Sequence, residues 1–193
     1  MSETILVTGA SAGFGQAICR RLVADGYRVI GSARRIDKLQ ALQEELGEDF
    51  YPLQMDVTDL SQVDHALASL PKAWERVDVL VNNAGLALGL TPAYEAEIAD
   101  WLTMIQTNIV GLTYLTRKIL PQMVERNDGY IINLGSTAGT VPYPGANVYG
   151  ASKAFVKQFS LNLRADLAGK KIRVSNIEPG LCEGTEFSSV RFK

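Results

Sequence analysis

Thr8-Gly9-Ala10-Ser11-Ala12-Gly13-Phe14-Gly15 joins the first apolar run of the chain, residues 5–8, to its first segment of helical periodicity, residues 14–25. Glycines let the backbone turn sharply after a strand and approach a pyrophosphate, whose charge then faces the helix N-terminus. The Ser11 hydroxyl can donate a hydrogen bond to such a phosphate, or it can cap the helix in an ordinary glycine-rich turn. We therefore predict a dinucleotide-binding loop whose contacts come from Gly9, Ser11, Gly13, Phe14 and Gly15.

Short apolar runs alternate with helical segments along the rest of the chain. The predicted strands are 5–8, 28–32, 50–54, 77–81, 130–134 and 172–177, and the predicted helices are 14–25, 36–46, 60–70, 96–126 and 148–167. Apolar strands separated by helices indicate a parallel sheet that is covered on both faces. Right-handed crossovers then give a doubly wound α/β fold of the Rossmann type, with three α/β/α layers.

No linker, repeat or low-complexity tract divides the sequence, so we expect a single domain over residues 1–193. The chain ends after the sixth predicted strand without a closing helix or a further strand. This ending predicts that the C-terminus is incomplete and lacks its last strand and lid.

The bulk composition excludes several classes of function. The 193 residues carry a net charge of −2, with 47% hydrophobic and 21% charged residues, so neither nucleic acid nor a membrane surface is expected as a partner. No apolar stretch reaches the roughly 20 residues that span a bilayer. Cys19 and Cys182 show no metal-ligand spacing, and the single histidine, His65, lies in a polar helical stretch. We therefore expect no metal site, and a reduced cytoplasmic compartment.

The second predicted strand ends in Ala33-Arg34-Arg35. A site for NAD usually places a carboxylate at this point, where it binds both ribose hydroxyls. Ala33 stands there instead, and a guanidinium suits a 2′-phosphate through charge-assisted hydrogen bonds. Cations at a helix N-terminus oppose the macrodipole, which favours a bound anion over a solvated basic helix start. The sequence therefore predicts NADP as cofactor, with Arg34 and Arg35 as contacts.

Tyr149-Gly-Ala-Ser-Lys153, with Ser136 upstream, is the candidate for proton transfer. A lysine four residues after a tyrosine shares its helix face, and a nearby ammonium favours the phenolate and lowers its pKa from about 10. The Ser136 hydroxyl can then polarise a carbonyl that the tyrosine protonates. Taken singly, Ser136 also suits a strand-end turn and Tyr149 a helix-start aromatic, so the assignment rests on their combination.

These motifs, in this order, resemble the short-chain dehydrogenase/reductase family. The glycine loop has the family spacing G-x-x-x-G-x-G, and residues 82–85 match its NNAG motif. The resemblance implies that Tyr149 is the acid/base, that Ser136 orients the substrate, and that Lys153 binds the nicotinamide ribose. It also implies that Asn108 completes a water relay to the lysine. The implied cofactor contacts after the glycine loop and the arginines are Asp56, Val57, Asn82, Ala84, Gly85, Tyr149, Lys153, Pro179, Gly180 and Thr185.

A narrower resemblance points to the NADP-dependent 3-hydroxy acid dehydrogenases, which act on L-serine, L-allo-threonine or malonic semialdehyde. It is carried by residues 134–139, 149–163, 178–181 and 185–192. It implies hydride transfer at the β-carbon of a short 3-hydroxy acid, with Ser136, Tyr149 and Arg191 contacting the substrate and Arg191 pairing with its carboxylate. Two alternatives remain: a broad carbonyl or sugar-alcohol reductase on the same scaffold, and a non-catalytic NADP-sensing module. The resemblance also implies a homotetramer or dimer, formed through helices 96–126 and 148–168.

Overall fold

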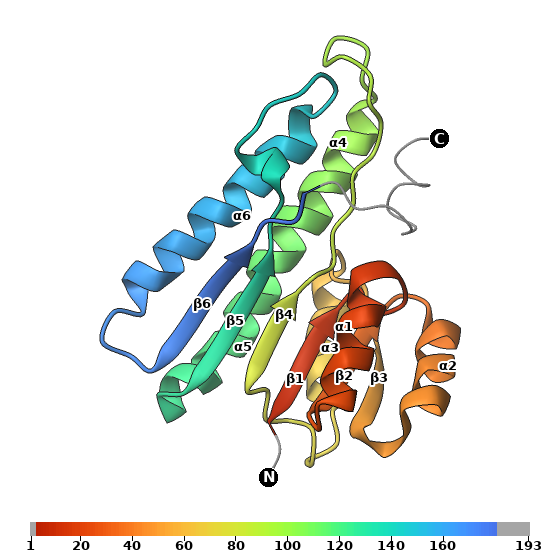
Figure 1. The fold of residues 1–193 in the computed structure, drawn as a ribbon, viewed down its shortest axis with the longest axis vertical. Coiled ribbons are helices and arrows are strands. Elements are labelled where there is room, and N and C mark those ends of the chain that lie inside the picture. The colour runs from red at the N-terminus through yellow and green to blue at the C-terminus, as the bar shows by residue number, and fades with distance from the viewer. Residues whose placement is uncertain (1–2, 181–193) are drawn as a thin grey trace.

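The computed structural model describes residues 3–180. Six strands of this part of the chain form a parallel sheet. The strands lie in the order β3-β2-β1-β4-β5-β6, which is the doubly wound topology predicted from the sequence (Figure 1). Their bounds are β1 Thr4–Thr8, β2 Arg28–Ala33, β3 Phe50–Gln54, β4 Val79–Asn82, β5 Gly129–Leu134 and β6 Ile172–Ile177. The helices are α1 Gly13–Ala24, α2 Ile36–Leu46, α3 Leu60–Ala68, α4 Ile98–Ile105, α5 Leu112–Arg126 and α6 Asn147–Asp166. Short 3₁₀ turns lie at Gly47–Asp49 and Thr137–Gly139.

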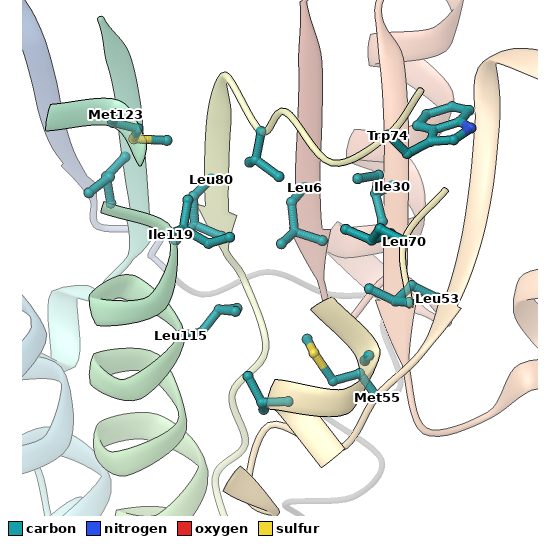
Figure 2. Close-up of a cluster of buried hydrophobic side chains, with 14 of the residues drawn as sticks. Leu6, Ile30, Leu53, Met55, Leu70, Trp74, Leu80, Leu115, Ile119 and Met123 are labelled. Atoms are coloured by element: carbon teal, nitrogen blue, oxygen red, sulfur yellow. The ribbon is translucent and has the colours of Figure 1, made fainter. Parts of the chain in front are cut away.

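Helices cover the sheet on both faces, as its near-continuous apolar strands require. Side chains of α3, α5 and α6 form one core cluster with Leu6, Ile30 and Leu80 of the central strands. Figure 2 shows Leu80 beside Ile119 of α5, and Ile30 beside Leu70 and Trp74 at the other side of the same cluster. Neighbouring strand residues point the other way and pack against α1 and α2 in a second cluster.

The second layer of helices covers one half of the sheet more fully than the other. Helices α1 and α2 lie against β1, β2 and β3. On β5 the side chains of Tyr130 and Ile132 are only partly buried, and Ile177 at the end of β6 is exposed. Within residues 3–180, the three-layer arrangement is therefore complete over the half of the sheet that contains the glycine loop.

The predicted helix 96–126 is the element that differs most from the expectation. A π-helical segment, Gln106–Gly111, separates α4 from α5. Such a segment adds one residue to a turn and changes the direction of the side chains that follow, and it often occurs at functional sites. A single inserted residue leaves the apolar pattern of the whole segment almost unchanged, so the periodicity could not reveal it.

None of the helices in residues 3–180 combines the length and the apolar character that a membrane crossing requires.

Candidate active site

A cleft of about 930 Å³ opens at the carboxyl ends of the strands. The loops after β1, β2, β3, β4 and β5 line it, together with the first turns of α6. The strand order reverses between β1 and β4, and ligands of open α/β sheets bind at such a reversal. The fold therefore brings most of the predicted site residues to one cleft.

The glycine loop after β1 forms one end of the cleft. Gly9 and Gly13 line it with positive φ values of 69° and 52°, a conformation that side chains rarely adopt. Gly15 serves a different purpose, because a Cβ there would stand 2.2 Å from the Gly9 carbonyl oxygen. It is not among the cleft-lining residues, and its role is to let α1 pack closely against the loop. Phe14, as predicted, lies in the cleft wall.

Ser11 does not cap α1, which rules out the alternative that we left open. The N-cap residue is Ala12, and no side chain bonds to the helix start. The Ser11 hydroxyl oxygen instead accepts hydrogen bonds from Arg35, at 3.0 Å from Nη2 and 3.3 Å from Nε. Arg34 and Arg35 are exposed and line the same end of the cleft, so two cations stand beside the phosphate loop.

Asp56 and Val57 line the cleft after β3, where the resemblance places the adenine. One oxygen of the Asp56 carboxylate, Oδ1, accepts hydrogen bonds from the Thr58 amide at 2.9 Å and the Thr58 hydroxyl at 2.8 Å. These bonds hold the carboxylate in a tight local turn at the edge of the cleft.

The four residues of the NNAG motif divide between the core and the cleft. Asn82 is only 3% exposed, and its Nδ2 donates to Asn133 Oδ1 at 2.8 Å and to Thr116 Oγ1 at 3.0 Å. The side chain of Asn82 is thus committed to the interior, and the residue is not part of the cleft wall, in contrast to our expectation. Asn83, Ala84 and Gly85 line the cleft instead.

Asn83 and Thr8 are two further residues at this end that were not predicted as site residues. The Asn83 amide group donates to the Thr8 carbonyl oxygen at 2.7 Å. The Thr8 hydroxyl accepts from the backbone amides of Asn83 and Ala84, at 3.0 and 2.9 Å. These bonds join the loops after β1 and β4 across the strand reversal. The signals in the sequence were the threonine at the start of the glycine loop and the second asparagine of the NNAG motif.

The predicted reacting groups Ser136, Tyr149 and Lys153 line the opposite end of the cleft. Tyr149 and Lys153 lie one turn apart on α6, and Lys153 Nζ is 5.9 Å from the centre of the tyrosine ring. The Ser136 hydroxyl oxygen accepts a hydrogen bond from the Ala138 amide at 3.1 Å, and its own hydrogen can still be donated to a substrate.

Lys153 is buried although it carries an ammonium group. Its Nζ donates to the Leu134 carbonyl oxygen at 2.8 Å, and the residue is 7% exposed. Burial lowers the pKa of the Lys153 ammonium from 10.5 to about 8, because the charged form loses its hydration. The group still carries its charge at neutral pH, where it favours the phenolate of a neighbouring tyrosine.

Asn108 lies within the π-helical segment and is 1% exposed. Its Oδ1 accepts from the Leu86 amide, and its Nδ2 donates to the Leu86 carbonyl oxygen, both at 2.9 Å. The same Nδ2 donates to Ser152 Oγ at 3.0 Å. A Cβ on Gly85 would lie 3.3 Å from both Asn108 Oδ1 and Lys153 Nζ, so the asparagine and the lysine approach the cleft from behind the same residue. The water relay through Asn108 stays a prediction.

Pro179 and Gly180 line the cleft beside Ser136. The Pro179 carbonyl oxygen accepts a hydrogen bond from the Thr137 amide at 3.1 Å, which ties the chain after β6 to the serine loop. Val141 and Tyr143 complete this end of the wall, and no motif had indicated them. The predicted contacts Thr185 and Arg191 lie outside the described residues. Within residues 3–180, no cluster of His, Cys, Asp and Glu could hold a metal ion.

Comparisons with known proteins identify the family of the chain. Residues 3–193 match the family model of the short chain dehydrogenases. A probable NADP-dependent dehydrogenase of Haemophilus influenzae is 63% identical over 191 residues, which cover 99% of this chain and 76% of the relative. An NADP-dependent 3-hydroxy acid dehydrogenase of Escherichia coli K12 is 60% identical over 189 residues, 98% of this chain and 76% of the relative.

A solved structure, the closed form of a serine dehydrogenase complexed with NADP⁺, superposes with a TM-score of 0.97 at 59% identity. The match covers 98% of this chain and 76% of that one. The fold is thus that of a known dehydrogenase, and the chain belongs to the short-chain dehydrogenase family.

Proposed function

We propose that the protein is an NADP-dependent oxidoreductase that transfers a hydride between the nicotinamide and the β-carbon of a short 3-hydroxy acid. Its substrates are of the type of L-serine, L-allo-threonine and 3-hydroxypropionate. One observation carries the proposal: Ser136, Tyr149 and Lys153 form one end of a cleft whose other end presents Arg34 and Arg35 beside a glycine loop.

The described residues fit NADP along the whole cleft. At Gly9 a Cβ would lie 2.9 Å from Asn83 Nδ2 and 3.0 Å from Ala84 Cα, so a glycine here lets the phosphate loop pack closely against the loop after β4. The start of α1 directs its amides towards a pyrophosphate, and Arg34 and Arg35 suit the 2′-phosphate. Lys153 holds the nicotinamide ribose, while Asp56 and Val57 contact the adenine. When bound, the cofactor supplies the hydride chemistry.

The side chains of the reacting end move the proton. Tyr149 takes a proton from the substrate hydroxyl during oxidation and returns it to the carbonyl during reduction. The Lys153 charge keeps the phenolate accessible near neutral pH. Ser136 donates its hydroxyl hydrogen to the substrate oxygen and holds it within reach of Tyr149, and Asn108 supports the lysine from behind Gly85.

The relatives support the class of substrate. One is described as a 3-hydroxy acid dehydrogenase and another as a serine dehydrogenase, both with NADP. A short hydroxy acid needs a cation for its carboxylate, and we assign that role to Arg191 and a cofactor contact to Thr185.

One observation favours a second candidate, a carbonyl or sugar-alcohol reductase of broader specificity. At the reacting end, Lys153 is the single cation among the described cleft residues, and Leu86, Val141 and Tyr143 give the wall an apolar character. An apolar wall suits neutral ketones and aldehydes as well as acids.

A substrate panel separates the two. We expect the full-length protein to oxidise L-serine, L-allo-threonine and 3-hydroxypropionate, with NADP preferred to NAD by about 100-fold in kcat/KM. Turnover of neutral ketones alone would favour the second candidate. Tight NADPH binding without turnover of any compound would make the protein a sensing module and overturn both.

We further propose that the protein forms a homotetramer or dimer through α4 and α6. The α4 side chains Ile98 and Leu102 are 62% and 59% exposed, and Phe155 and Leu161 of α6 are 37% and 45% exposed. Exposed apolar groups on neighbouring helices are typical of a subunit interface. Light scattering on the protein and on a Leu102→Glu variant measures this directly: a single monomeric mass for the unmodified protein would contradict it.

A further inference from the structure

We propose that Ser152 is a positioning residue for the proton-transfer pair, a role that rests on the function proposed above. It joins the turn of α6 that carries Tyr149 and Lys153 to the π-helical segment Gln106–Gly111 and, through that segment, to the loop after β4. Ser152 is not itself part of the cleft wall, and it acts by holding the residues that are.

The contacts of Ser152 form a chain between three segments. Its hydroxyl donates to the Tyr149 carbonyl oxygen at 2.7 Å, within the helix turn that starts at the catalytic tyrosine. Its oxygen accepts from Asn108 Nδ2 at 3.0 Å. Asn108 in turn bonds to both the amide and the carbonyl of Leu86, immediately after Gly85 of the cleft wall.

The side chains of Ser152 and Asn108 cannot exchange these hydrogen bonds for others, because both are buried and all their donors are in use. Ser152 and Asn108 are each 1% exposed, so no solvent can replace a lost partner. Both amide hydrogens of Asn108 are used, one on Leu86 and one on Ser152. Removing the Ser152 hydroxyl leaves a buried N–H unpaired, and the asparagine must move or remain unsatisfied. Either result perturbs Asn108, whose Oδ1 approaches the same side of Gly85 as Lys153 Nζ.

The same helix contains an internal control. Ser160 is also 1% exposed, and its hydroxyl donates to its own helix, to the Val156 carbonyl oxygen, at 2.7 Å. Its oxygen accepts from an asparagine amide as well, Asn133 Nδ2, at 2.9 Å. Ser152 and Ser160 thus have the same burial and the same kinds of bonds.

The two serines differ in what lies at the other end of their bonds. Eight residues separate them, which is about 12 Å along a helix axis. Ser160 connects α6 to β5 in the interior of the sheet, through Asn133 and Asn82. Ser152 connects α6 to the segment behind the reacting groups. Loss of either hydroxyl should weaken the fold similarly, but only loss of the Ser152 hydroxyl should disturb proton transfer.

The test compares Ser152→Ala with Ser160→Ala in the full-length protein. We expect both variants to lower the melting temperature by similar amounts. Ser152→Ala should lower kcat by about tenfold or more and change KM for the hydroxy acid less than threefold. Ser160→Ala should keep kcat within twofold of the unmodified enzyme. Equal kcat values in the two variants would overturn the proposal, whether both are high or both are low.

A second pair covers the case in which the alanine variants do not fold. Ser152→Cys and Ser160→Cys leave no cavity, because a thiol is slightly larger than a hydroxyl, but they weaken both hydrogen bonds, because a thiol is a poor donor and acceptor. We expect kcat to fall severalfold in the first and to stay unchanged in the second, and equal values again overturn the proposal. An unmodified enzyme that fails the substrate panel would remove the proposed function, and this inference with it. If the unmodified enzyme is active but the Ser152 and Ser160 variants have equal kcat values, only the inference about Ser152 is overturned.

Discussion

At the end of the cleft formed by β1 and β2, the wall contains two glycines with positive φ, whereas at the end formed by β5 and α6 it contains the buried side chains of Tyr149 and Lys153. Gly9 and Gly13 exemplify the first end, where the backbone conformation requires residues without a side chain. Lys153 exemplifies the second, where a charge is kept in the interior by a carbonyl oxygen at 2.8 Å.

This difference calls for two kinds of experiment. At the glycine end, substitutions should act through sterics and therefore through stability and cofactor binding. At the reacting end, they should act above all on the rate of proton transfer.

The largest effect is expected at Tyr149. Tyr149→Phe removes the transferable proton while keeping the ring, and general acid–base catalysis of this kind contributes about 10²–10⁴-fold. We expect kcat/KM to fall by about 10³-fold, with the NADPH dissociation constant unchanged, as measured by cofactor fluorescence. Tyr130→Phe is a suitable control, because the Tyr130 hydroxyl bonds to Ser175 on the neighbouring strand and is not part of the cleft. Near-normal turnover of Tyr149→Phe would end the assignment of this residue as the acid/base.

The strongest steric effect is expected at Gly15. A Cβ there would stand 2.2 Å from the Gly9 carbonyl oxygen, and main-chain atoms cannot step aside as a flexible side chain can. Gly15→Ala should therefore lower the free energy of unfolding by about 3 kcal/mol. Gly26→Ala is the matched control, since its φ of 86° is unfavourable for alanine but its Cβ would meet nothing within 4 Å, so it should cost only about 1 kcal/mol. Equal urea midpoints for the two variants would show that close packing at the loop is unimportant.

The sequence was most informative at the glycine end, for a physical reason. A close approach of main-chain atoms requires glycine at a defined spacing, so the spacing alone predicted that Gly9 and Gly13 belong to the site. The ranges of β3, α2 and β6 were also predicted to the residue, because turn residues and clear periodicity bound them.

The sequence was less informative where buried partners decide what a side chain does. Asn82 belongs to the same short motif as Ala84 and Gly85, yet its amide points to Asn133 and Thr116 in the core. Ser152 stands between two predicted site residues, and only the π-helical segment brings Asn108 to it. Such roles depend on contacts between residues 34 or more positions apart along the chain, which no local pattern reports.

A pH-dependent effect of intermediate size is expected from Lys153. Its folded-state pKa of about 8 lies below the ordinary value of 10.5, so between these values the unfolded state binds more protons. The free energy of unfolding should therefore rise with pH from about 8 to about 10.5, by at most about 3 kcal/mol. Lys153→Met should abolish this rise in urea titrations of the cofactor-free protein.

Cys19 acts in the opposite direction over part of this range. Burial raises the pKa of its thiol from 9.0 to about 12, so ionisation of the unfolded state lowers stability above about pH 9. Because Cys19 is present in both proteins, its contribution cancels in the difference between the unmodified protein and Lys153→Met. A difference that does not change with pH would show that Lys153 keeps its ordinary pKa in the folded state.

The smallest effect is expected at the two arginines, because they are exposed and their charges are screened by salt. Arg34→Ala and Arg35→Ala should each raise KM for NADPH by about tenfold, leave kcat unchanged and alter KM for NADH less than twofold. Arg20→Ala, which removes an exposed arginine paired with Glu45 on the neighbouring helix, should change neither constant.

The effects of Arg35→Ala on the KM for NADPH and on the KM for NADH, compared with each other, show whether Arg35 binds the 2′-phosphate or supports the loop. Arg35 donates two hydrogen bonds to Ser11 in the phosphate loop, so its loss also removes a support of that loop. A loosened loop would weaken NADPH and NADH alike, since both carry the pyrophosphate that the loop receives. A lost partner of the 2′-phosphate weakens NADPH alone, and raising the salt concentration should then reduce the difference between Arg35→Ala and the unmodified enzyme. Equal weakening of NADPH and NADH binding would therefore show that Arg35 supports the loop and does not select the cofactor. A side chain would then hold the cleft wall in place at the glycine end as well.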